Sequence, residues 1–146
     1  KRLLLDVNVL LDVLLDRDPW AESASALWAA IESGRARGFI PAHGVTTLHY
    51  LMRKGRGAAF ADRGTADLLT VFGVARVDDR VLKAALALRF PDFEGAVCAA
   101  AGAAARCDFL VTRDPAGFRG SPVEVASPGE ALVRLARHRK AASRRK

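Results

Sequence analysis

The sequence predicts an α/β fold in which helices surround a mostly parallel sheet. Short apolar runs of strand length alternate with longer segments whose apolar residues recur at helical spacing, and this alternation continues along the chain. The chain has 146 residues, of which 51% are hydrophobic, and neither an internal repeat nor a shift of composition divides it. These observations together favour a single α/β domain.

The expected elements follow from the positions of the apolar residues. Apolar runs of strand length lie at residues 3–5, 39–40, 74–77, 109–112 and 123–125. Apolar residues recur at helical spacing over residues 7–15, 19–34, 45–52, 57–72, 81–88, 94–106 and from 128 onward. Pro19 is suited to open the second helix, and Asp78 or Asp79 can cap the fifth. Ser127 and Pro128 are typical of an N-cap and a first helical position.

The positive charge of the chain is concentrated at its end. The net charge is +7, from 23 bases and 16 acids. Seven of the bases lie in the last thirteen residues, which contain no acid: Arg134, Arg137, Arg139, Lys140, Arg144, Arg145 and Lys146. The remaining 16 bases equal the 16 acids, so the rest of the chain is formally neutral. A solvated tail is the simpler interpretation of this segment, and contact with nucleic-acid phosphates is the alternative.

No part of the sequence is typical of a membrane or secreted protein. No apolar run approaches the ~20 residues that cross a bilayer. Asp6 interrupts the first apolar run too early for a signal peptide. We therefore expect a cytoplasmic protein with no membrane partner. Cys98 and Cys107 do not form short Cys-x-x-Cys steps, so we expect free, buried thiols rather than zinc ligands or a disulfide framework.

Two acids follow expected strands and are the most informative pattern in the sequence. Asp6 comes directly after residues 3–5, and Asp114 follows residues 109–112. Ligands of an open parallel sheet bind outside the carboxyl ends of its strands, where these acids are expected to lie. Gathered carboxylates repel one another unless a hard cation such as Mg²⁺ or Mn²⁺ neutralises them. Asn8 can orient the Asp6 carboxylate or a metal-bound water, although Asp and Asn are also common cap and turn residues.

Four segments resemble PIN-domain proteins in their order and spacing. They are DVNVLLD at residues 6–12, LHYLMRK at 48–54, PDFE at 91–94 and VTRDP at 111–115. Residues 118–123 and the helix after Pro128 resemble the end of that domain, so the similarity covers about residues 2–135. The resemblance implies a three-layer α/β fold with a mostly parallel central sheet flanked by helices. It also implies a PIN-like domain at residues 1–135 followed by a basic C-terminal tail at 136–146.

The resemblance also implies an activity. In the family, four acids hold one or two Mg²⁺ or Mn²⁺ ions, which activate water for attack on an RNA phosphodiester. Such a metal supplies the nucleophile and stabilises the leaving oxygen, so few other catalytic side chains are needed. Small bacterial members of the family are commonly the toxins of toxin–antitoxin pairs. A cognate antitoxin protein inhibits them, and a homodimer is the assembly that the resemblance suggests.

The sequence departs from this pattern at two of the four acidic positions. Asp6 and Asp114 match the family, and each is expected to be both a catalytic residue and a metal ligand. The other two positions are occupied by Thr47 and Gly95. A threonine can hydrogen-bond a metal-bound water but carries no charge, and a glycine offers no ligand at all.

Two nearby acids can compensate for the glycine. Asp92 lies three residues before Gly95 and roughly on the same helix face, and the longer Glu94 can reach from an irregular helix start. Both are therefore candidate metal ligands. The alternative is structural, because Asp92 is suited to cap the helix and Glu94 to interact with the helix dipole.

Three bases are candidates for contact with RNA. Arg113 precedes Asp114 and is the base best placed to meet a scissile phosphate. Arg53 and Lys54 belong to a small basic cluster that can meet RNA phosphates or simply form a solvated helix end.

The tryptophans and histidines are expected to have structural roles. Trp20 and Trp28 lie at helical spacing with no interleaved bases, so we expect core or dimer-interface residues rather than a platform for base stacking. His43 and His49 lie on different helix faces without a third ligand nearby. They are expected at the surface or at a helix start, not in a zinc site.

Three function classes remain at this stage. The first is a Mg²⁺- or Mn²⁺-dependent endoribonuclease that acts as the toxin of a toxin–antitoxin pair. The second is a PIN-like module that has lost two of four acidic ligands and only binds RNA or a protein. A phospho-acceptor or phosphatase domain is disfavoured, because Asp6-Val7-Asn8 lacks the second Asp of a phosphatase start.

Overall fold

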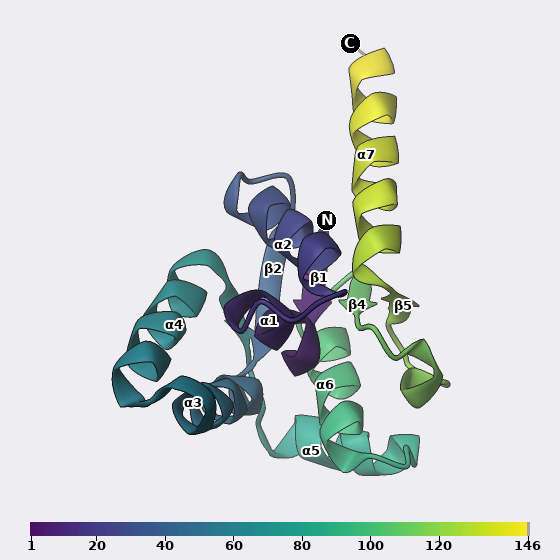
Figure 1. Ribbon diagram of the computed structural model, residues 1–146. Coiled ribbons are helices and arrows are strands. Elements are labelled where there is room, and N and C mark those ends of the chain that lie inside the picture. The colour runs from purple at the N-terminus through teal and green to yellow at the C-terminus, as the bar shows by residue number, and fades with distance from the viewer. Residues whose placement is uncertain (146) are drawn as a thin grey trace.

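A computed structural model of the protein describes residues 1–145 (Figure 1). Within this range five strands form one sheet: β1 (Arg2–Leu5), β2 (Arg37–Pro41), β3 (Gly73–Ala75), β4 (Phe109–Val111) and β5 (Glu124–Ala126). Their order is β3-β2-β1-β4-β5, and every pairing is parallel. The predicted α/β class with a mostly parallel sheet is confirmed.

Seven α-helices and one short 3₁₀ helix accompany the strands in the described residues. They are α1 (Val7–Leu14), α2 (Ala21–Glu32), α3 (Ala42–Arg56), α4 (Ala58–Val71), α5 (Asp79–Leu88), α6 (Phe93–Ala104), η1 (Pro115–Phe118) and α7 (Pro128–Arg144). Every expected helix is present. The second begins at Ala21 instead of Pro19, because the Arg17 carbonyl accepts the N–H groups of Trp20 and Ala21 and closes a turn there. The strand expected at residues 74–77 is confined to β3, and Asp78 caps α5.

The central strand separates two hydrophobic cores. Leu3 and Leu5 face a core formed with α1, α2, α3, α4 and α7, whereas Leu4 faces a core formed with α5, α6 and η1. A strand covered on both faces needs an uninterrupted apolar run, which is what residues 3–5 provide. The helices thus enclose the sheet from both sides, giving the three-layer arrangement seen in Figure 1.

The parallel sheet brings the ends of its strands to one edge. Asp6 follows β1, α3 begins directly after β2, and Thr112 follows β4. Because β1 pairs with both β2 and β4, these three positions are neighbours at the carboxyl edge of the sheet. The candidate functional residues are therefore anchored to the three central strands.

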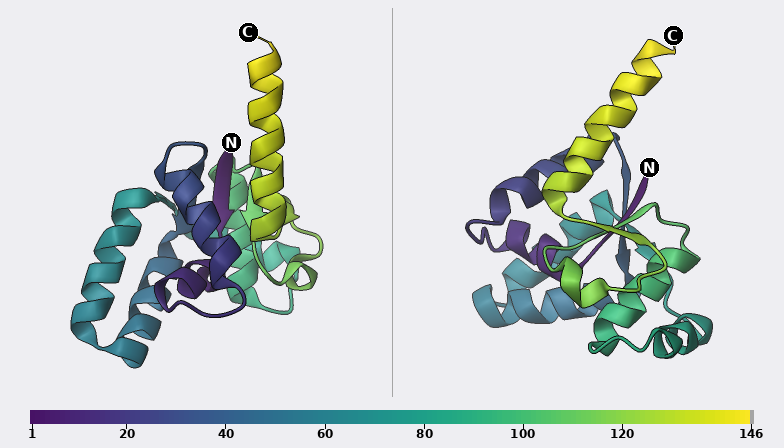
Figure 2. Two further views of the ribbon diagram at one scale, coloured as in Figure 1. Left: turned by 45° about the horizontal axis from the view of Figure 1, so that its top comes forward. Right: turned by 90° about the vertical axis from the view of Figure 1, so that its right-hand side faces the viewer.

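The basic segment at the end of the chain continues a helix. α7 runs to Arg144, and its distal part projects from the body of the molecule in all three views (Figures 1 and 2). Residues 136–145 are exposed, and Lys146 lies outside the described residues. In the part of the chain that the structure covers, the helices are too short or too polar to cross a membrane.

Candidate functional site

Asp6 lies at the centre of the carboxyl edge and is held by the adjacent strand. Its backbone N–H donates to the carbonyl of Val111 at 2.9 Å and so extends the pairing of β1 with β4. The hydroxyl of Thr112, which is fully buried, donates to Oδ2 of Asp6 at 3.0 Å. The same hydroxyl accepts the backbone N–H of Asp114 at 3.1 Å. Thr112 thereby joins the two strand ends that carry the predicted acids.

The environment of Asp6 disfavours its negative charge. Burial raises the pKa of the Asp6 carboxyl, and the charges of Glu94 and Asp92 raise it further. Hydrogen bonds from Thr112 and from the backbone of Val7 oppose this shift but do not cancel it. The negative charges of Asp92 and Glu94 therefore act on Asp6, while their role as metal ligands stays a prediction.

The start of α6 presents both acids next to an open position. Oδ1 of Asp92 accepts the backbone N–H of Glu94 at 3.2 Å, so the expected N-cap is confirmed. Gly95 is buried. A Cβ atom there would lie 3.6 Å from the other oxygen of Asp92 and 3.6 Å from the ring of Phe118, which is ordinary van der Waals contact. A Cβ atom at position 95 would therefore contact the Asp92 carboxylate and the Phe118 ring without a clash.

Asp114 and Asn8 are placed differently from Asp6. Asp114 is exposed, and its carboxylate folds against η1, where a Cβ on Gly117 would approach Oδ2 of Asp114 to 2.9 Å. Asn8 is exposed in the first turn of α1, and its carbonyl accepts a weak hydrogen bond from Nη2 of Arg17 at 3.4 Å. Asp114 is linked to Asp6 only through Thr112 in these hydrogen bonds.

α3 contributes a histidine that the sequence did not single out for the site. His43 lies in the first turn of α3, as expected, but both of its ring nitrogens are buried without a hydrogen-bond partner in the described residues. Burial lowers the pKa of His43, while the charge of Glu94 raises it. The hydroxyl of Thr47 donates to the His43 carbonyl at 3.3 Å. The position of His43 directly after a strand end was the signal that could have identified it.

The candidate bases are not gathered around Asp6. Nε of Arg113 lies 3.2 Å from Oδ2 of the buried Asp12, and its guanidinium stacks on Trp20 with Cζ 3.7 Å from the ring centroid. Arg53 and Lys54 are exposed near the end of α3, ten residues beyond His43 and hence ~15 Å along the helix axis.

The structure corrects part of the prediction for the tryptophans. Trp28 is half-buried and packs edge-to-face on Phe72 with ring centroids 4.9 Å apart, in agreement with a core role. Trp20 is 43% exposed, so the core alternative is wrong for it.

The thiols are free, as expected, but only Cys98 is buried. Cys107 is half-buried, and burial raises its pKa to about 11.

The acids at this edge do not form a complete metal site. Among residues 1–145, no three Asp, Glu, His or Cys side chains lie close enough to hold one ion. Thr47 and Gly95, which offer no carboxylate, occupy two of the four positions where the PIN resemblance places acids. Mg²⁺ and Mn²⁺ prefer several oxygen ligands around one ion. The residues present therefore do not fit a fully liganded Mg²⁺ or Mn²⁺ centre.

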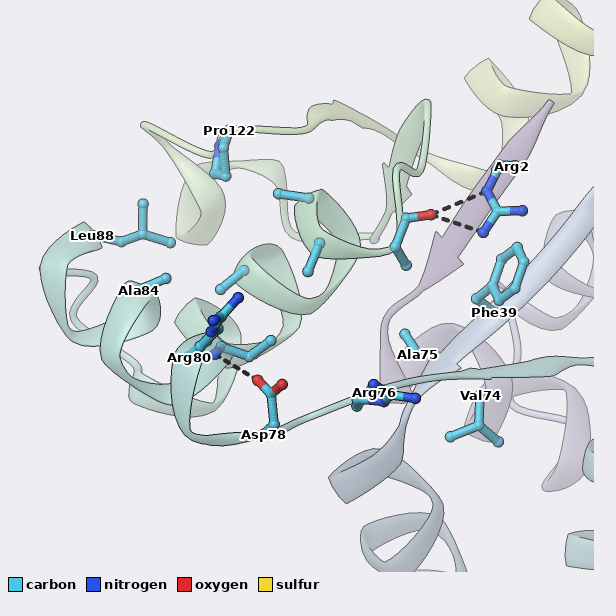
Figure 3. Close-up of a pocket in the computed structure, with 15 residues that line it drawn as sticks. Arg2, Phe39, Val74, Ala75, Arg76, Asp78, Arg80, Ala84, Leu88 and Pro122 are labelled. Atoms are coloured by element: carbon cyan, nitrogen blue, oxygen red, sulfur yellow. Dashed lines mark hydrogen bonds between the residues drawn. The ribbon is translucent and has the colours of Figure 1, made fainter.

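One cavity lies away from these acids, between β3, α5 and α6 (Figure 3). It measures about 820 Å³, and none of the predicted site residues lines it. Two of its charged groups have structural partners: Arg2 donates to the Ala105 carbonyl at 2.8 and 3.1 Å and stacks on Phe39, and Asp78 caps α5. Asp78 is the one acid among the residues that line this cavity, whereas the candidate site combines Asp6 with Asp92 and Glu94.

Comparison with known proteins agrees with this fold. The sequence profile of the PIN domain matches residues 2–116. VapBC2 of Rickettsia felis, solved with a DNA fragment from its promoter, aligns at TM-score 0.68 and 12% identity over 87% of this chain and 98% of that one. FitAcB of Neisseria gonorrhoeae aligns at TM-score 0.67 and 18% identity, over 87% of this chain and 98% of its own. VapC20 of Mycobacterium tuberculosis, a sarcin-ricin loop cleaving toxin, aligns at TM-score 0.62 and 18% identity. The alignment covers 74% of this chain and 86% of that one. No curated protein matches the chain significantly.

Proposed function

Because this chain belongs to the PIN-domain family, we propose that it is a toxin-type PIN domain that binds RNA and whose metal-dependent RNA cleavage is reduced by the loss of two acids. The observation that carries this proposal is the position of Gly95. It lies beside Asp92, where a Cβ atom would fit without a clash, and an acid there would restore one of the two missing carboxylates. Gathered carboxylates without a cation are costly to the fold, which supports a functional origin for this edge.

The partners we propose follow from the structural relatives. VapBC2 and FitAcB are complexes of a toxin with its antitoxin, and VapC20 cleaves the sarcin-ricin loop. By analogy, the partner of this chain is an antitoxin protein and its ligand is RNA. A homodimer is the assembly that the family resemblance suggests. Arg53, Lys54 and the exposed bases of α7 then supply phosphate contacts away from the acids.

The proposed metal ligands are Asp6, Asp114, Asp92 and Glu94, with Mn²⁺ or Mg²⁺ as the ion. Because these residues do not form a complete site, we assign no hydrolytic step to the ion in the wild-type chain. Asn8 remains a proposed orienting residue for Asp6.

Restoring an acid at position 95 tests the proposal. We expect Gly95→Asp to cleave single-stranded RNA with Mn²⁺ at least about tenfold faster than wild type, since it adds a carboxylate beside Asp92. Gly95→Ala is the matched control, because it fills the same space without a ligand. Calorimetry with Mn²⁺ should show tighter binding for Gly95→Asp alone, and Asp6→Asn in that background should abolish the gained cleavage.

Two outcomes contradict the proposal. Wild-type cleavage as fast as that of Gly95→Asp, and lost in Asp6→Asn, would identify a fully active ribonuclease. Failure of the wild-type chain to bind RNA by anisotropy of a labelled strand would rule out the RNA ligand.

A further inference from the structure

Trp20 is an exposed aromatic side chain that the core does not use. It lies in the turn between α1 and α2, and 43% of its surface is accessible. The guanidinium of Arg113 stacks on the indole with Cζ 3.7 Å from the ring centroid. One face of the ring is therefore covered by a cation, and we place the accessible area on the opposite face and the edges.

A buried carboxylate, that of Asp12, binds the guanidinium that stacks on Trp20. Asp12 is 1% exposed, and its Oδ2 forms an ion pair with Arg113, whose Nε lies 3.2 Å away. Its other oxygen accepts a hydrogen bond from Nε of Arg17 at 2.8 Å and lies 2.8 Å from Nη2 in the same ion pair. Two guanidinium groups bound to one buried carboxylate cannot rotate freely, so Arg113 has a defined position under the ring. The indole of Trp20 thus contacts an arginine from the segment after β4, and Asp12 of α1 holds that arginine in place.

This support is continuous with the candidate site. In the chain, Arg113 stands between Thr112 and Asp114. The hydroxyl of Thr112 donates to the Asp6 carboxylate and accepts the backbone N–H of Asp114. The Trp20 platform, defined as Trp20 with Arg113, Asp12 and Arg17, therefore flanks the carboxyl edge of the sheet. Two arginines and one aspartate give the platform a net charge of +1.

We propose that the free face of Trp20 stacks an unpaired base of single-stranded RNA next to the carboxyl edge. A rigid aromatic ring backed by a guanidinium is the arrangement with which proteins hold unstacked bases without reading their identity. This inference rests on the proposed RNA ligand and assigns the residue that selects single strands. Asp16 and Asp18 are exposed in the same turn, so stacking rather than phosphate attraction provides the affinity here.

Intrinsic fluorescence gives a direct test. The chain has two tryptophans, so Trp28→Phe leaves Trp20 as the sole reporter. A uridine oligoribonucleotide, titrated with EDTA present to prevent cleavage, should quench its emission saturably. The same strand annealed to its complement should quench it at least about tenfold less effectively, because paired bases are already stacked.

Variants at position 20 separate stacking from folding. We expect Trp20→Ala to weaken binding of the labelled uridine strand roughly tenfold, with a salt dependence equal to that of wild type. Trp20→Phe should restore most of this affinity, whereas Trp20→Leu, which is apolar but has no π-system, should not. Tyr50→Ala is the matched control, because Tyr50 is 63% exposed on α3 outside the platform, and it should bind as wild type does.

The outcomes distinguish this inference from the proposed function. Equal RNA affinity of wild type and Trp20→Ala, or unquenched Trp20 emission on saturation, overturns the inference while the RNA ligand stands. An absence of RNA binding in every variant overturns both. A shift from dimer to monomer in Trp20→Ala with unchanged RNA affinity would place Trp20 in a subunit contact and also overturn the inference.

Discussion

Asp6 and Asp12 lie on consecutive elements, one at the end of β1 and the other in α1, yet their surroundings are opposite. Asp12 is 1% exposed and is bound by the guanidinium groups of Arg17 and Arg113. No ion pair with a base forms at Asp6 within residues 1–145. Burial raises the pKa of Asp6, and the negative charges of Glu94 and Asp92 raise it further. The fold therefore neutralises one inward-facing aspartate and leaves the other among like charges.

The difference shows which carboxylate serves the fold and which does not. A buried charge stabilises a protein only when its partners compensate the lost hydration, as they do at Asp12. A buried acid kept among other acids costs stability, and such an arrangement is typical of a site that needs an external cation or substrate. Each of the following predictions tests this contrast.

The largest effect is expected from loss of the Asp12 charge. Asp12→Asn keeps the size of the side chain, but its single carbonyl can serve only one arginine while its amide faces the other. Removal of one partner from a buried pair costs several kcal/mol. The arginine side chains are 32% and 26% exposed, so solvent screening reduces the loss. We expect a decrease of about 2 kcal/mol in the free energy of unfolding, measured in urea.

An exposed aspartate provides the control for this change. Asp62 is 76% exposed and lies 2.8 Å from His49. Asp62→Asn should change the free energy of unfolding by less than about 0.5 kcal/mol. An equal effect of the two substitutions would show that Asp12 is no more important to the fold than a surface acid.

Asp6→Asn should act in the opposite direction. An amide still accepts a hydrogen bond from Thr112 and has no charge for Glu94 and Asp92 to repel. We expect the free energy of unfolding at pH 7 to rise by about 0.5 to 1 kcal/mol. The gain should depend on pH. The folded-state pKa of Asp6 lies above its ordinary value of 3.8, so the unfolded chain releases this proton at lower pH. Wild type therefore loses stability relative to the variant as the pH rises above about 3.8.

Urea unfolding of both proteins between pH 3 and pH 7 measures this difference. The curves should converge at the acid end and separate towards neutral pH. A variant that is less stable than wild type at pH 7 would show that the Asp6 charge stabilises the fold, and the contrast with Asp12 would be lost.

The sequence predicted the position of Asp6 but not the partners of either aspartate. Alternation of apolar runs is a local property, so the strands, the helices and the acid at the end of β1 follow from it. The contacts of Asp12 depend on Arg113, which is distant in the chain and reaches α1 only because β4 pairs with β1. For the same reason the stack of Arg113 on Trp20 leaves no pattern in the sequence, because no base adjacent to either tryptophan in the chain indicates it.

His43 marks another limit of sequence reasoning. Its place directly after a strand end is visible in the sequence, but the burial of its ring nitrogens depends on how α3 packs near Glu94. Gly95, by contrast, was predicted as a missing acid from the sequence, and that stays a prediction; the structure adds that a Cβ atom there would contact Asp92 and Phe118 without a clash.

The smallest effect is expected at His43, and it decides whether the carboxylates around Asp6 lack a cation at neutral pH. Burial lowers the pKa of His43 below its ordinary value of 6.5. The unfolded chain therefore binds this proton first, and its contribution to stability is lost as the pH falls from about 6.5 through the folded-state pKa. Because His43 is only half-buried, screening limits the loss to a few tenths of a kcal/mol. His43→Gln should remove this dependence between pH 7 and pH 5, and NMR titration of the imidazole should give a midpoint below 6.5. A midpoint above 6.5 would mean that Glu94 outweighs burial, and one above about 7 would mean that a protonated His43 gives Glu94 a cation at neutral pH, as Arg17 and Arg113 do for Asp12.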